Sequence, residues 1–173
     1  IGDSTFFHSG LPALVNAVQA EDEITVVILD NYITAMTGFQ PSPTTDRLAA
    51  KRDLPPASLA PDANSDRSAI ERAARGLGVC EIFSADPFDE EAALTALRQA
   101  QRGTGVNVVV FHAPCVVNER RVTKGRSRAP FAINRELCSA CSLCVRVLGC
   151  PGILVVDDTY TIARDLCNGC ALC

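Results

Sequence analysis

Apolar and amphipathic stretches alternate along most of the chain. Between residues 11 and 18, leucine and valine recur at helical spacing, and residues 24–29 form a continuous, largely β-branched apolar run. Such a run is typical of a strand buried on both faces of a parallel sheet. The pattern also predicts a helix at 68–77, a strand at 79–83, a helix at 86–102 and a strand at 106–111. This order indicates an α/β fold in which residues 1–115 form part of a doubly wound parallel sheet.

Composition argues against some classes of binding partner and indicates separate domains. Its 173 residues allow one or two domains, and the formal net charge of −4 argues against a nucleic-acid-binding surface. No apolar run is long enough to cross a bilayer, so no membrane contact is expected. Seven of the nine cysteines lie in residues 138–173. We therefore expect an α/β domain at 1–115, a linker at 116–137 and a cysteine-rich domain at 138–173.

The cysteines of the last segment form two C-x2-C-x2-C trios with a Cys-Pro step between them. The first trio is Cys138, Cys141 and Cys144; Cys150 precedes Pro151; the second trio is Cys167, Cys170 and Cys173. This arrangement resembles bacterial two-cluster ferredoxins, in which a trio binds one [4Fe–4S] cluster and the Cys-Pro of the other half supplies the fourth ligand. A disulfide framework or a zinc site fits two such trios poorly.

The ferredoxin resemblance implies a small α+β domain with two [4Fe–4S] clusters. Cys150 would join the second trio, and the first trio would bind the other cluster. Five residues separate Cys144 from Cys150, instead of the three of the common ferredoxin run, so the loop is expected to bulge. The fourth ligand of the first trio is expected a few residues beyond Cys173. For this reason, and because the first residue is Ile1, we expect the sequence to be an internal fragment of a longer protein.

Oxygen-bearing side chains stand at both ends of the first predicted helix–strand pair. Asp3 precedes the helix, and Asp30 and Asn31 directly follow the apolar run. In open α/β sheets ligands bind at the carboxyl ends of the strands, where Asp3 and Asn31 are expected to meet. Hard oxygen ligands of this kind suit Mg²⁺. Gly2-Asp3 alone would indicate no more than a turn, and its spacing from Asn31 makes a metal site the favoured interpretation.

Gly-Asp followed by a downstream Asn resembles the thiamine diphosphate motif. The resemblance implies that Mg²⁺ is held by Asp3, Asn31 and the backbone carbonyl of Ile33. It also implies that the diphosphate lies against Gly2, Ser4 and Thr5.

The loop at 32–40 carries a further resemblance. It reads Tyr-Ile-Thr-Ala-Met-Thr-Gly-Phe-Gln, and its Thr-Gly-x-Gln resembles the 2-oxoacid:ferredoxin oxidoreductases, most closely the alpha subunits of their indolepyruvate branch. The resemblance implies that Thr37 also binds the cofactor. The pyruvate branch has Asn where this chain has Met36, and a deformable apolar side chain suits a larger aromatic substrate, unless Met36 packs in the core. His8 would face the thiazolium ring or the substrate carboxylate, or cap a helix that begins near Gly10.

The family resemblance covers residues 1–40 and 138–173 and implies an enzyme. Its expected activity is oxidative decarboxylation of an aryl 2-oxoacid, with the acyl group passed to coenzyme A and the electrons to an external ferredoxin. A beta subunit, a hetero-oligomer and a reducing cytoplasm are implied as well. The alternatives are a pyruvate-type oxidoreductase and an electron-transfer protein fused to an α/β domain; a non-oxidative decarboxylase would need no clusters. The residue that activates the cofactor's pyrimidine is expected outside this segment, which should be inactive alone.

Four other segments carry weaker expectations. Residues 41–66 hold five of the ten prolines and are expected to form a lid or a subunit-contact loop. The basic stretch at 119–128 is interpreted as a solvated linker, with docking of an acidic ferredoxin as the alternative. Cys80 and Cys115 are expected to be small buried apolar residues. Residues 153–162 are expected to form a β-hairpin that turns at Asp157-Asp158.

Overall fold

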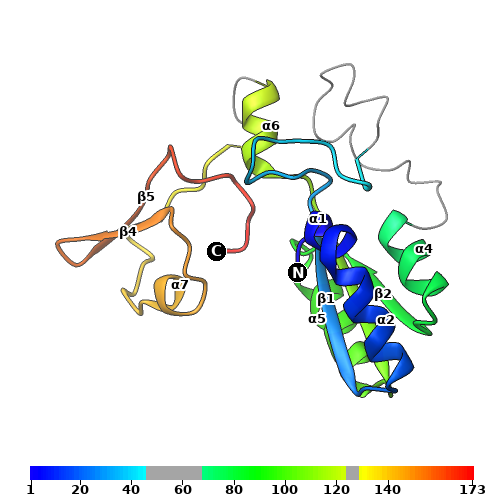
Figure 1. Ribbon diagram of the computed structural model, residues 1–173. Coiled ribbons are helices and arrows are strands. Elements are labelled where there is room, and N and C mark those ends of the chain that lie inside the picture. Colours follow the sequence, from blue (N-terminus) through cyan, green and yellow to red (C-terminus); the bar gives the residue numbers. More distant parts are fainter. Residues whose placement is uncertain (46–67, 124–128) are drawn as a thin grey trace. The chain divides into compact units, whose positions relative to one another are not determined.

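The computed structural model describes residues 1–45, 68–123 and 129–173, in two compact units, Ile1–Lys124 and Gly125–Cys173. A parallel sheet forms the centre of the first unit (Figure 1). Its strands, in the spatial order β1-β3-β2, are β1 (Ile24–Asp30), β2 (Glu81–Ala85) and β3 (Val106–His112). The register pairs Asp30 with His112, so the carboxyl ends of β1 and β3 are level. The parallel α/β sheet predicted from the apolar runs is confirmed.

Helices cover both faces of this sheet (Figure 1). The three main ones are α2 (Leu11–Gln19), α4 (Ala69–Gly76) and α5 (Glu90–Arg102). Val108 and Val110 of β3 cluster with buried residues of α2 and α4, whereas Val109 and Phe111 cluster with buried residues of α5. Because successive side chains of a strand point to opposite faces, the apolar run of β3 contributes to both halves of the core.

The chain enters the sheet beside β1 and turns at once into a helix. Gly2 forms a parallel bridge with Leu29, whose N–H donates to the carbonyl of Ile1 at 2.8 Å. Helical structure then runs without interruption through α1 (Asp3–Thr5), the π-helical turn η1 (Phe6–Gly10) and α2. The helix expected to begin near Gly10 therefore begins earlier, at Asp3. Phe6 is 1% exposed and anchors this first helical turn in the core.

Two further elements begin two or more residues later than predicted. β2 begins at Glu81, so Cys80 lies before the strand, and its side chain is exposed rather than buried as expected. α5 begins at Glu90 because Asp89 caps it, its carboxylate accepting the N–H of Ala92 at 3.0 Å.

Part of the expected linker forms a further helix, α6 (Val116–Thr123). Its buried Asn118 accepts two hydrogen bonds from Arg121, at 3.2 and 3.1 Å, and the Arg121 guanidinium lies 4.8 Å from the centre of the Phe39 ring. This helix therefore packs against the loop that follows β1. The expected lid lies outside the described residues from residue 46 to residue 66. In the part of the chain that the structure describes, no helix is long and apolar enough to cross a membrane.

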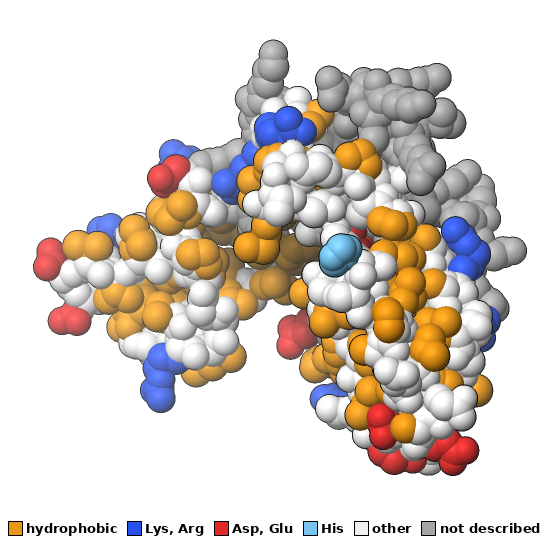
Figure 2. Space-filling model, in the orientation of Figure 1, with side chains coloured by type: hydrophobic (Ala, Val, Ile, Leu, Met, Phe, Trp, Pro, Cys, Tyr) orange, Lys and Arg blue, Asp and Glu red, His pale blue; other side chains and the backbone are white. Residues whose placement is uncertain are grey.

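The second unit contains a short helix and a hairpin. These are α7 (Leu143–Arg146), β4 (Ile153–Val156) and β5 (Thr159–Ile162), with β4 and β5 antiparallel. The hairpin and its turn at Asp157-Asp158 are as predicted, and both turn residues have positive φ, 47° and 55°. Figure 2 shows apolar side chains on the surface of this unit, and Leu137 and Val147 are among the most exposed.

Candidate functional site

A buried carboxylate stands where the first helix meets the carboxyl edge of the sheet. Asp3 is 3% exposed, and its Oδ2 accepts hydrogen bonds from the hydroxyls of Ser42 at 2.8 Å and Thr44 at 3.0 Å. Burial raises the pKa of Asp3 above its ordinary value, and the hydrogen bonds from Ser42, the Ser4 backbone and Thr44 only partly offset this. Among the described residues its partners are neutral donors, so a bound cation would stabilise the charged form.

The turn after β1 is held by its own side chains. The Asn31 Oδ1 accepts the N–H of Ile33 at 3.1 Å, and the Asp30 Oδ1 accepts the N–H of Tyr32 at 3.1 Å. The hydroxyl of Thr45 donates to the carbonyl of Tyr32. Since residues 42–45 contact both this turn and Asp3, they join the two halves of the expected metal site.

The loop with the Thr-Gly-x-Gln pattern closes on itself. Thr34 and Gln40 form an antiparallel bridge, and the Thr37 hydroxyl donates to Gln40 Oε1 at 2.7 Å while Gln40 Nε2 donates to the Thr37 carbonyl at 2.9 Å. The Ser4 hydroxyl lies 2.7 Å from that of Thr34, which ties the loop to the first helix. Met36 is fully exposed in this loop, so it does not pack in the core of the described residues.

The predicted metal donors have the chemistry that Mg²⁺ requires, and the backbone at Gly2 has open space beside it. Asp3, Asn31 and the Ile33 carbonyl offer only hard oxygens, which Mg²⁺ prefers. A side chain built at Gly2 would meet no atom within 4 Å, so the backbone there faces open space. His8 is exposed within η1 and lies inside the continuous helix, so it does not cap a helix that starts near Gly10.

A histidine at the end of β3 lies between two carboxylates. The Nδ1 of His112 is 3.1 Å from Asp30 Oδ2, and its Nε2 is 3.5 Å from Glu71 Oε1. Burial lowers the pKa of His112, but the hydrogen bonds and charges of Asp30 and Glu71 outweigh burial and raise it to about 9. The hydrogen bond with His112 in turn lowers the pKa of Glu71.

We expect the free energy of unfolding to fall as the pH rises through about 9. The folded pKa of His112 lies above the ordinary value of 6.5, so its stabilisation is complete below pH 6.5 and lost towards and above about 9. The loss should amount to about 3 kcal/mol. Urea unfolding over a pH series should give a flatter profile for His112→Phe, whereas exchanging the exposed histidine, His8→Gln, should leave the profile unchanged. Identical profiles for all three proteins would contradict this assignment.

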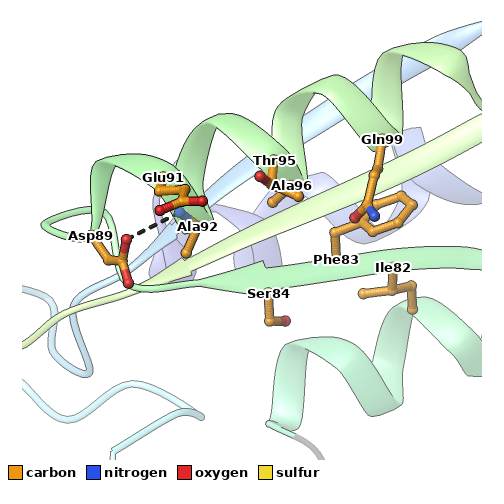
Figure 3. A pocket seen from close by; sticks show the side chains of 9 residues that line it. All are labelled: Ile82, Phe83, Ser84, Asp89, Glu91, Ala92, Thr95, Ala96 and Gln99. Atoms are coloured by element: carbon orange, nitrogen blue, oxygen red, sulfur yellow. Dashed lines mark hydrogen bonds between the residues drawn. The ribbon is translucent and has the colours of Figure 1, made fainter.

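A second concavity lies along β2 and α5. It has a volume of about 590 Å³ and is lined by β2 and α5 (Figure 3). Its lining includes Phe83, Glu91, Thr95 and Gln99 but none of the residues predicted to bind cofactor. We therefore do not assign the expected chemistry to it.

The seven clustered cysteines line two cavities of the second unit. The first, of about 420 Å³, is lined by Cys138, Cys141, Cys144 and Cys173 together with the apolar side chains of the hairpin. The second, of about 20 Å³, is lined by Cys150, Cys167, Cys170 and Cys173. Cys150 thus lines a cavity with the cysteines of the second trio, and Cys173 lines both cavities.

The two trios repeat one backbone conformation. The residues on both sides of the middle cysteine have positive φ: Ala140 (54°) and Ser142 (64°) in the first trio, Gly169 (69°) and Ala171 (66°) in the second. For a non-glycine residue this costs about 1–2 kcal/mol, and such strain clusters at functional sites. The Leu143 N–H and then the Ser139 hydroxyl lower the pKa of the Cys141 thiol, which favours the thiolate form that metals bind.

The polar donors of these cavities are mostly thiols, the kind of ligand that iron–sulfur clusters need. All the cysteines are free thiols. Within the described residues, no three Cys, His, Asp or Glu side chains are close enough together to share one metal ion. The cluster ligands therefore remain a prediction.

Sequence reasoning missed several residues of the first site. Ser42, Thr44 and Thr45 lie in the segment interpreted as a lid, although a run of hydroxyl residues beside a predicted metal site is a usable signal. His112 is the last residue of a buried strand, and the rule about carboxyl ends of parallel strands that placed Asn31 would have found it as well.

Comparison with known proteins identifies the class. Residues 1–111 match the family described as thiamine pyrophosphate enzyme, C-terminal TPP binding domain. The chain belongs to this family of thiamine pyrophosphate enzymes.

Individual relatives show which kind of thiamine pyrophosphate enzyme the chain resembles. The chain is 36% identical over 157 residues to the indolepyruvate oxidoreductase subunit IorA of Pyrococcus horikoshii, covering 88% of this chain and 22% of that subunit. The subunit of the same name from Methanothermobacter marburgensis is 36% identical over 157 residues (91% and 23%), and that from Archaeoglobus fulgidus 35% over 162 residues (94% and 24%). The chain thus spans less than a quarter of these relatives' length. The predicted resemblance to the indolepyruvate alpha subunits is confirmed.

Proposed function

We propose that the full-length protein is a thiamine diphosphate- and Mg²⁺-dependent 2-oxoacid:ferredoxin oxidoreductase acting on aryl 2-oxoacids of the indolepyruvate kind. The observation that carries this proposal is the occurrence in one chain of buried Asp3 beside the turn at 31–33 and of two thiol-lined cavities. The matched family supports the cofactor, and the relatives' name supports the substrate class.

In this proposal Asp3, the Asn31 side chain and the Ile33 carbonyl hold Mg²⁺. The diphosphate lies against Gly2, Ser4 and Thr5, with the Thr37 loop beside them. Thiamine diphosphate, when bound, supplies the electron sink for decarboxylation of the 2-oxoacid. The chain's part is to bind the metal with buried oxygens, to fix the turn that carries two of them, and to keep water from the Asp3 carboxylate.

The second unit is proposed to be a ferredoxin-like α+β domain with two [4Fe–4S] clusters. Cys150 and the second trio bind one cluster, and the first trio binds the other. Coenzyme A is the proposed acceptor of the acyl group and external ferredoxin that of the electrons. A beta subunit in a hetero-oligomer and a reducing cytoplasm complete the proposal. The domain division at 1–115, 116–137 and 138–173 is proposed on the same basis.

The test is an anaerobic assay of the full-length protein with its partner subunit. Indolepyruvate and coenzyme A should reduce ferredoxin only when thiamine diphosphate and Mg²⁺ are present. Reduction of the clusters by external donors without any turnover of 2-oxoacids would favour an electron-transfer protein. Release of carbon dioxide without reduction of ferredoxin would favour a non-oxidative decarboxylase.

Met36→Asn should change substrate choice. Met36 is exposed in the loop beside the proposed cofactor site, and replacing it removes apolar surface that an aromatic substrate would bury. The ratio of kcat/KM for indolepyruvate to that for pyruvate should fall by about tenfold. Met36→Leu, which keeps apolar volume, is the matched control and should preserve the ratio. An equal loss with both substrates would show that Met36 does not select between them.

A further inference from the structure

A charged network lies behind the turn at 31–33. Asp30 ends β1, His112 ends β3, and both leave the sheet on the same face because they are register partners. Glu71 of α4 approaches the imidazole from that face. The Ser84 hydroxyl donates to Glu71 Oε1, and Figure 3 shows Ser84 on the side of β2 that faces α4. Carboxylates of β1 and α4 therefore contact the imidazole ring at the end of β3, and Ser84 of β2 contacts one of them.

The contacts of the His112 ring indicate its protonation state. Both nitrogens of His112 face carboxylate oxygens, which can only accept hydrogen bonds, so only the imidazolium satisfies both contacts. The side chains of Asp30, Glu71 and His112 are 0%, 15% and 19% exposed. Charges taken so far out of water must be paired, and this requirement fixes the three groups relative to one another.

The same network contacts the turn in two places. The Asp30 Oδ1 accepts the Tyr32 N–H at 3.1 Å, and the Tyr32 ring stacks on that of His112 with centroids 6.2 Å apart and planes 9° apart. Tyr32 has a φ of 62°, in the left-handed region. This conformation is unfavourable for a non-glycine residue, and it persists only where its surroundings hold it.

We propose that His112 is a positioning residue that fixes the turn presenting Asn31 and the Ile33 carbonyl to the metal. This inference rests on the proposed function, in which that turn holds Mg²⁺. His112 orients Asp30, and Asp30 holds the Tyr32 N–H, which lies between the two ligands in the chain. Partners behind metal ligands typically change metal affinity by about 10- to 100-fold.

Two substitutions of similar size at His112 distinguish its contact with Asp30 from its contact with Glu71. His112→Asn keeps an amide near the position of Nδ1, where it can still donate to Asp30. His112→Gln carries its amide to the position of Nε2, towards Glu71, and leaves Asp30 without this donor. Val110→Ala, two residues earlier in β3, removes buried volume in the core and controls for a general loss of stability.

The measurement is a Mg²⁺ titration of the full-length protein with saturating thiamine diphosphate. The readout is cofactor retained after gel filtration, with Mn²⁺ paramagnetic resonance as a second probe of the metal. His112→Gln should raise the Mg²⁺ concentration at half-retention by about tenfold or more, and His112→Asn by less than about threefold. Val110→Ala should lower the unfolding temperature and leave the titration unchanged.

Three results would overturn the inference. These are equal shifts in the two His112 variants, no shift in either, and a shift in Val110→Ala as large as that in His112→Gln. Failure of the unaltered protein to retain thiamine diphosphate at any Mg²⁺ concentration would instead overturn the proposed function on which the inference rests.

Discussion

Asp3→Asn should weaken Mg²⁺-dependent retention of thiamine diphosphate by at least about 100-fold in the full-length protein, a loss of about 3 kcal/mol. The substitution removes the charge but keeps an oxygen that can accept from Ser42 and Thr44. Burial raises the pKa of Asp3, so in the absence of a cation the charged carboxylate destabilises the fold above that pKa. Without Mg²⁺ and cofactor, the neutral variant should therefore unfold at the same or a higher temperature, although it binds the metal less tightly.

This opposite movement of stability and metal binding is the decisive feature of the test. A purely structural Asp3 would lose stability when it is changed, and metal retention would follow only as a consequence of unfolding. Asp22→Asn, in the exposed turn between α2 and β1, is the matched control and should alter neither quantity. Iron content should stay unchanged in both variants. Normal cofactor stoichiometry in Asp3→Asn at the usual Mg²⁺ concentration would refute the assignment of this residue as a ligand.

The sheet could be predicted because its strands are buried on both faces. The runs at 24–29 and 106–111 are apolar at nearly every position, a pattern that few other structures require. The start of the first helix could not be predicted in this way. Residues 3–10 contain glycine and hydroxyl residues that are common in loops, and the helix forms there because Phe6 packs into a core that only the fold creates.

Only part of the candidate site could be predicted from the sequence. Asp3 and Asn31 could be predicted because one rule about strand ends places both. Their supporting groups could not, because Ser42 and Thr44 reach Asp3 from about 40 residues away in sequence, through a turn with no periodic pattern. The Glu71 contact with His112 likewise depends on how α4 packs against the sheet, which no local signal encodes.

Cys150→Ser should remove one of the two proposed clusters and lower the iron content of the full-length protein from about eight to about four atoms. Cys150 lines the same cavity as Cys167 and Cys170, whereas Cys138, Cys141 and Cys144 line the other cavity. Serine is a weak ligand for iron compared with a thiolate, so the cluster bound by the second trio should be lost.

Paramagnetic resonance on the reduced protein distinguishes which cluster is damaged. The signal that disappears in Cys150→Ser should be the one that also disappears in Cys170→Ser, and the signal lost in Cys141→Ser should survive. Cys80→Ser, which changes an exposed thiol of the first unit, is the control and should keep about eight irons. If Cys150→Ser and Cys141→Ser eliminate the same signal, Cys150 belongs to the first trio. The crossed pairing would then be wrong, even though Cys150 lines the cavity of the second trio.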